Sequence, residues 1–254
     1  MYLSEVNDFE SSMHVGPAPI KLEKKSDEYS CIVFTYDVPH RKTYDTLTLL
    51  KAKGFKNVLV YAVPMHYKKT FKPLYEHRPQ VIHNIFPSEL AKNLGYEYYQ
   101  GNRYEEFEEK TESVILVCGA GIIPGDIVKS NVIVNAHPGY IPYARGLDAL
   151  KWAIIEDKPI GVTTHLLGDE VDAGEIISRI EIPVYDNDTF HSVSQRVYEN
   201  EINMLVDALF HISERHEYIK VGNTILHKRM PSEVEHGLLL KFEEYKQIHA
   251  CKDN

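Results

Sequence analysis

Short apolar segments alternate with helix-like segments over the first two thirds of the chain, and this alternation most constrains the fold. Residues 29–36 read YSCIVFTY and residues 57–63 read NVLVYAV, which are β-branched and aromatic runs typical of buried strands. Between them, residues 43–53 place leucines among polar residues, and Gly54 follows as a helix stop signal. Strand, helix and strand in this order form a βαβ unit, which predicts an α/β fold with a mainly parallel sheet.

The same alternation continues toward the C-terminus. Further strands are predicted at residues 113–117, 131–135, 160–167 and 175–182, and further helices at residues 88–94, 126–129, 147–156 and 188–214. Strands at residues 218–221 and 224–227 flank Gly222-Asn223, a dipeptide favoured in tight turns, so a hairpin is predicted there, and a terminal helix follows Pro231.

These elements divide the chain into three parts. We expect a polar lead-in at residues 1–28, a main α/β domain at residues 29–187, and a small C-terminal helix and hairpin extension at residues 188–254 packed on the core. A chain of 254 residues with 43% hydrophobic residues can bury a full core.

Charge and composition restrict the partners. The formal net charge of -9 argues against nucleic acid as the main partner, because phosphate binding needs clustered Lys and Arg. No apolar run approaches the ~20 residues that cross a bilayer, and the N-terminal sequence MYLSEVNDFESS has no signal-peptide character. Cys31, Cys118 and Cys251 are widely spaced, which predicts a reducing, cytoplasmic location. The sequence leaves open whether the chain forms a homodimer.

The segment with most chemical information begins NVIVNAHPGYIPYARGLDALKWAI at residue 131 and continues IGVTTHLLGDEVDAGEII from residue 160. A buried strand is predicted to end at Asn135, at the sheet edge where α/β folds bind ligands. Asn135 and His137 are two positions apart and would point the same way on an extended chain. Acyl transfer to an amine needs a base, an oxyanion donor and a group that orients the base; His137, Asn135 and Asp172 have the matching side chains.

Four submotifs of this segment together resemble the N10-formyltetrahydrofolate-dependent formyltransferase family. They are Asn-x-His-Pro, Ile-Pro-x-x-Arg-Gly followed by a helix with Trp152, Gly-x-Thr-x-His, and Asp-x-Gly-x-Ile-Ile. The resemblance is clear over residues 113–182 and looser from residue 29. It implies a Rossmann-like formyltransferase fold, with the family's catalytic Asn, His and Asp at Asn135, His137 and Asp172.

The resemblance also implies a formyl donor and its site. N10-formyltetrahydrofolate would bind as a co-substrate, without a metal, in a cleft between two loops. One loop comprises Cys118, Gly119, Ala120, Gly121 and Ile122, and the other comprises Gly168, Asp169, Glu170 and Val171. Zinc could be held by His137, His165 and Asp172, but their spacing fits no standard metal motif, and His165 is expected to have a supporting role. Tyr140 departs from the family pattern, which places Ser or Thr near the His-Pro, and it could shape the acceptor side differently.

Three branches of the family differ in their amine acceptor. The segment TYDVPHRKTYD after the first strand lacks the glycines of a phosphate loop, which disfavours glycinamide ribonucleotide. The C-terminal part is short and not basic, which disfavours methionyl-tRNA. Amino-sugar N-formyltransferases, which serve surface polysaccharide biosynthesis, are the branch that the chain is most similar to. The sugar could be nucleotide-linked or a nonulosonic, pseudaminic-type precursor.

Other readings stay open from the sequence. A hydrolase could use the same triad to release formate from formyltetrahydrofolate, and a binding module could carry a degenerate site. One basic-aromatic cluster could contact an anionic acceptor or could be a solvated surface; it comprises Tyr67, Lys68, Lys69, Phe71, Lys72, Tyr75 and Arg78.

Overall fold

A computed structural model of the chain describes residues 29–66, 72–80, 83–107, 111–168, 172, 174–213, 217–219 and 224–251. The predicted lead-in at residues 1–28 lies outside these ranges. The loop residues Asp169, Glu170 and Val171, and most of the basic-aromatic cluster, lie outside them too.

Within the described residues, eight strands form one sheet in the order β3-β2-β1-β4-β5-β7-β8-β9. The four pairings from β3 to β5 are parallel and the three from β5 to β9 are antiparallel, so the predicted mainly parallel α/β sheet is confirmed. The strands are β1 (Cys31–Tyr36), β2 (Val58–Val63), β3 (Glu97–Gln100), β4 (Ile115–Val117), β5 (Ile133–His137), β7 (Gly161–Leu166), β8 (Gly174–Glu181) and β9 (Glu217–Ile219).

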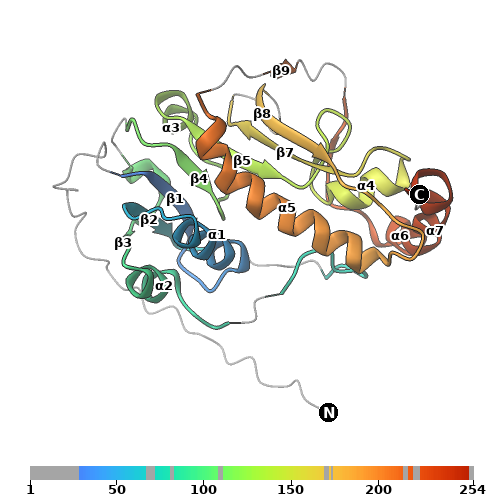
Figure 1. The fold of residues 1–254 in the computed structure, drawn as a ribbon, viewed down its shortest axis with the longest axis horizontal. Helices are drawn as coiled ribbons and strands as arrows, with labels where there is room; N and C mark the ends of the chain where they lie inside the picture. Colours follow the sequence, from blue (N-terminus) through green and yellow to red (C-terminus); the bar gives the residue numbers. More distant parts are fainter. Residues whose placement is uncertain are drawn as a thin grey trace, which may run out of the picture.

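Helices cover both faces of this sheet. Three of them, α1 (Arg41–Ala52), α2 (Pro87–Leu94) and α5 (Phe190–His211), pack on one face, and Figure 1 shows α5 crossing the sheet beside α1. The short α3 (Gly125–Ser130) packs on the other face, with the 3-10 turn Tyr104–Glu106. At the far end lie α4 (Ala149–Ile155), α6 (Ser232–Glu235) and α7 (Leu238–His249). None of the helices in the described part of the chain is long and apolar enough to cross a membrane.

The residues predicted to end, begin and bury the helices do so in the structure. Helix α2 ends at Gly95 in the left-handed conformation that glycine adopts at no steric cost. Helix α5 begins after Thr189, whose side chain accepts from Ser192 N in a capping box. On α1, Leu47 and Leu50 are fully buried against the sheet, and each such side chain stabilises the fold by about 2 kcal/mol.

The strand predicted at residues 131–135 ends two residues later in the structure. Strand β5 continues to His137, because β7 pairs with it in an antiparallel register up to His137 opposite Thr163. Asn135 and His137 therefore both lie within the strand and point to the same face. The residues that leave the strand start at Pro138.

The hairpin predicted at residues 218–227 is wrong. Strand β9 joins β8, whereas β10 (Leu226–His227) pairs in parallel with β6 (Arg145–Gly146) in a separate two-stranded sheet. Gly146 has φ +88 there, and a Cβ on it would lie 2.2 Å from His227 O, so glycine permits this close approach. The backbone pairing with β6 outweighs the local turn signal, whose Gly222-Asn223 lies outside the described residues.

Candidate active site

Four polar side chains meet over the carboxyl half of β5. Asn135 and His137 project from β5, and His165 lies opposite Asn135 on β7. Asp172, from the connection between β7 and β8, places Oδ1 3.5 Å from His137 Nδ1 and 3.7 Å from His165 Nε2. The structure therefore brings the three predicted catalytic residues together, with a second histidine between them.

A backbone carbonyl fixes the ring of His137. His137 Nε2 lies 2.8 Å from Ala144 O, and because a carbonyl only accepts, Nε2 must carry the hydrogen. The basic lone pair of the neutral ring is then on Nδ1, which faces Asp172. Gly139 makes this contact possible, since a Cβ there would lie 2.6 Å from Nε2 and 2.3 Å from Ala144 O.

His165 orients the amide of Asn135. Burial lowers the pKa of His165 to about 4, and the opposing effect of the Asp172 carboxylate does not offset it. The neutral ring places Nδ1 3.1 Å from Leu166 O, so Nδ1 is the donor and Nε2 the acceptor. Asn135 Nδ2 donates to Nε2 over 3.4 Å, which leaves the second amide hydrogen of Nδ2 to point elsewhere.

The Arg-Gly pair of the sequence motif holds Asp172. Gly146 N donates to Asp172 Oδ2 over 2.9 Å, and Arg145 Nε donates to the backbone carbonyl of Asp172 over 2.9 Å. Asp172 itself has φ 48, an uncommon conformation that these two contacts stabilise. In the sequence, Arg145 and Gly146 stand out only as parts of a motif; their role in placing Asp172 needs β6 to lie beside the β7–β8 connection.

The two residues that begin the predicted folate loop are part of the core. The amides of Cys118 and Gly119 both donate to Phe34 O, over 3.0 and 3.3 Å. Burial raises the pKa of the Cys118 thiol to about 11, with a smaller opposing effect of Lys42. The part of this loop that faces solvent begins at Ala120.

Described residues of the first predicted loop and at the start of the second lie over the face of the sheet that carries Asn135. Ala120 from the first loop and Leu167 from the edge of the second pack against the same apolar cluster, which includes Val117 and Ile133. Ile122 is 98% exposed, and a Cβ at Gly168 would meet no atom within 4 Å. Both residues therefore face open space on this side of the sheet.

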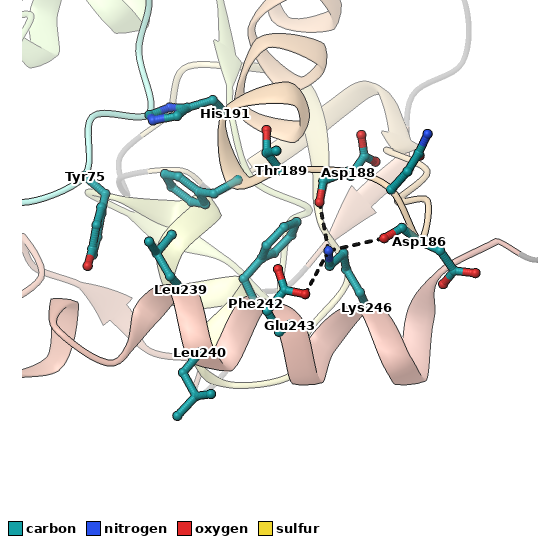
Figure 2. A pocket seen from close by; sticks show the side chains of 12 residues that line it. Tyr75, Asp186, Asp188, Thr189, His191, Leu239, Leu240, Phe242, Glu243 and Lys246 are labelled. Carbon is teal, nitrogen blue, oxygen red and sulfur yellow. Dashed lines mark hydrogen bonds and ion pairs between the residues drawn. The ribbon is translucent and has the colours of Figure 1, made fainter.

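Other features lie apart from this cluster. Among the described residues, no group of three or more His, Cys, Asp or Glu side chains is arranged to hold a metal ion. A pocket of about 740 Å³ lies between the start of α5 and α7 (Figure 2), where Lys246 contacts the carbonyls of Asp186 and Asp188. Tyr75 of the basic-aromatic cluster lines it, and none of the described residues of the predicted triad and folate loops does.

Three known proteins show different kinds of similarity. A dTDP-4-amino-4,6-dideoxyglucose formyltransferase from Mycobacterium tuberculosis is 30% identical over 105 residues, which are 41% of this chain and 45% of that protein. The trifunctional purine biosynthetic protein adenosine-3 from Gallus gallus is 39% identical over 95 residues, which are 35% of this chain and 10% of that protein. A solved sugar 3N-formyl transferase is 15% identical, with a TM-score of 0.56 over 85% of this chain and 80% of its own.

The likeness to the solved structure shows the fold, while this chain spans less than half the length of either curated relative. The sequence model of the formyl transferase family matches residues 47–209, which include β5, β7 and Asp172. Because this match covers more than half of the 254 residues, the chain belongs to the formyl transferase family.

Proposed function

We propose that this protein transfers a formyl group from N10-formyltetrahydrofolate to the amino group of an amino sugar. The observation that carries the proposal is the convergence of Asn135, His137 and Asp172, with His137 Nδ1 3.5 Å from Asp172 Oδ1. A base, an oxyanion donor and a carboxylate within reach of one carbon are what amide formation requires.

Each side chain has one task in this reaction. The amine nitrogen attacks the formyl carbon, and the free Nδ2 hydrogen of Asn135 donates to the developing oxyanion. His137 Nδ1 takes the proton that the amine loses, and the Asp172 carboxylate stabilises the imidazolium so formed. Collapse of the tetrahedral intermediate breaks the bond from carbon to N10. N10 takes the proton from the His137 imidazolium and leaves as tetrahydrofolate, which returns His137 to its neutral form.

The formyl donor would lie between Ala120–Ile122 and Gly168–Asp172. Support comes from the open space that Ile122 and Gly168 face and from the solved sugar 3N-formyl transferase, which was crystallised in the presence of dTDP and 5-N-formyl-THF. Cys118 and Gly119 would support the loop from below, since their amides already bond Phe34 O.

The acceptor class rests on relatives of this fold. One relative is named for a dTDP-linked amino sugar, and the solved neighbour is a sugar formyl transferase. The segment between β1 and α1 has no glycine, so it lacks a phosphate loop of the kind that a nucleotide-monophosphate acceptor would need.

An amine panel tests this function. The purified protein is incubated with N10-formyltetrahydrofolate and nucleotide-linked or nonulosonic amino sugars, and each product is examined by mass for one added formyl group. We expect one amino sugar to be formylated with an equal release of tetrahydrofolate. Release of formate that does not depend on any amine would instead identify a hydrolase, and formylation of methionyl-tRNA alone would contradict the sugar acceptor.

A further inference from the structure

The carbonyl of Ala136, between the two catalytic residues of β5, has no partner in the neighbouring strand. Ile115 N donates to Val132 O over 2.9 Å, so even-numbered carbonyls in this region point toward β4. Ala136 O points the same way, and the next donor in this register would be Gly119 N. Gly119 N instead donates to Phe34 O over 3.3 Å, because the chain diverges from β5 after β4 ends.

A lysine takes the place of the missing strand donor. Lys42 Nζ, from the first turn of α1, lies 3.3 Å from Ala136 O and 2.8 Å from Glu201 Oε1 on α5. The side chain of Ala136 packs in the apolar cluster with Leu205 of α5, on the face opposite Asn135 and His137. The ammonium therefore reaches the catalytic strand from behind.

This ammonium belongs to a buried network of charges. The Lys42 side chain is 10% exposed and that of Glu201 is 1% exposed, and Arg78 Nη1 donates to Glu201 Oε2 over 2.6 Å. Burial alone would raise the pKa of Glu201, but the Arg78 and Lys42 cations outweigh it, so the pKa is lowered and the carboxylate is charged. A buried pair of this kind adds little net stability, because desolvation offsets the attraction.

Local sequence preferences do not explain a lysine at this position. Helix α1 begins Arg41-Lys42 with no acidic residue in its first turn, so two cations lie at the positive end of the helix dipole. Burial, followed by Lys42 and Arg78, lowers the pKa of the adjacent His40 to about 4, so this ring adds no third charge. Departures from local rules of this kind are expected where a site requires them.

We infer that Lys42 is a positioning residue for formyl transfer, which fixes the Ala136 carbonyl and thereby the placement of Asn135 and His137 where β4 diverges. Glu201 holds the ammonium in place, and the exposed end of Arg78 completes the charge balance of that carboxylate. This inference rests on the proposed function. A misplacement of reacting groups by about 1 Å costs about a hundredfold in rate, so the contact matters for turnover more than for binding.

The experiment must separate two roles of Lys42, which are to position the Ala136 carbonyl and to neutralise the charge of Glu201. Lys42→Met alone leaves Glu201 with one cation and can reduce stability. The double variant Lys42→Met/Glu201→Gln removes both buried charges together with the ammonium that contacts Ala136 O. A matched control is Lys151→Met/Glu235→Gln, which removes the fully buried pair between α4 and α6, away from β5.

Three quantities are measured on each folded variant: kcat, the Kd for folate, and deuterium exchange of a peptide spanning residues 133–139 without substrate. For the Lys42/Glu201 double variant we expect kcat to fall by about tenfold to a hundredfold, folate Kd to stay within about twofold, and exchange to accelerate. The Lys151/Glu235 control should keep both kcat and exchange near the wild-type values.

A double variant with wild-type kcat and exchange would overturn the inference and reduce Lys42 to a charge partner of Glu201. Exchange does not need an amine acceptor, so it distinguishes the two possible failures. If wild-type protein formylates no amine, the proposed function fails, whereas unchanged exchange in the double variant refutes the role of Lys42 by itself.

Discussion

Replacing Asp172 with Asn tests the central electrostatic contact of the proposed mechanism. The amide oxygen of Asn can still accept from Gly146 N, which donates to Asp172 Oδ2 over 2.9 Å. The backbone contact from Arg145 is also unaffected. Asp172→Asn therefore removes the charge that faces His137 while leaving the loop in place, and the loss should fall on catalysis.

The size of the effect follows from the 3.5 Å between His137 Nδ1 and Asp172 Oδ1. Two unit charges at this separation attract by about 5 kcal/mol at an effective dielectric constant of ~20. Solvent screens part of this, since the Asp172 side chain is 11% exposed, and measured effects of one neighbouring opposite charge are about 1.4–4 kcal/mol. We expect Asp172→Asn to lower kcat by about 10–10³-fold.

The assay is steady-state release of tetrahydrofolate with the amine identified in the panel, together with a fluorescence titration of folate. The folate Kd and the free energy of unfolding should stay near wild type, because the hydrogen bond to Gly146 N persists. A folded Asp172→Asn protein with kcat within about threefold of wild type would refute the reasoning, since the imidazolium would then need no carboxylate.

Three further changes have defined outcomes. Asn135→Ala removes the proposed oxyanion donor and should lower kcat by about 10²–10³-fold with an unchanged folate Kd, as measured by the same kinetics and titration. Gly146→Ala places a side chain at φ +88 and 2.2 Å from His227 O, so urea unfolding should show a loss of at least about 1 kcal/mol; an unchanged midpoint would contradict this geometry. Burial lowers the folded pKa values of His40 and His165 to about 4, below the ordinary histidine value of 6.5, so the unfolded chain binds more protons in this range. Stability should therefore be complete above about pH 6.5 and fall by about 2–3 kcal/mol per histidine at pH 4.5, and a His165→Gln protein should show a flatter pH dependence in urea unfolding.

Elements with strong local signals could be predicted from the sequence. Strands β1 and β2 are buried on both faces and read as continuous apolar runs, and Gly95 and Thr189 mark helix ends through their own conformation and side chain. Elements whose bounds depend on pairing with residues far away in the sequence could not be predicted in this way. The extension of β5 to His137 depends on pairing with Thr163, and the place of β10 depends on Gly146.

The candidate site also has one part that could be predicted from the sequence and another part that could not. Asn135, His137 and Asp172 lie in a recognisable motif, so their convergence could be anticipated. The sequence could not predict which nitrogen of His137 is basic, because this depends on Ala144 O and on the close approach at Gly139. The contact between Lys42 and Glu201 joins residues 159 apart in the sequence, and no spacing rule predicts it.

Each of the three proposed catalytic side chains is oriented by a group that takes no part in the proposed reaction. Ala144 O orients His137, His165 orients Asn135, and Gly146 N orients Asp172. Dipoles held in this way need little reorganisation when charge develops on the formyl oxygen, which is how preorganised donors lower a barrier. Because these orienting contacts lie within the protein and not toward the acceptor, a change of amine specificity within this fold would leave them unaltered and would act through the surrounding loops.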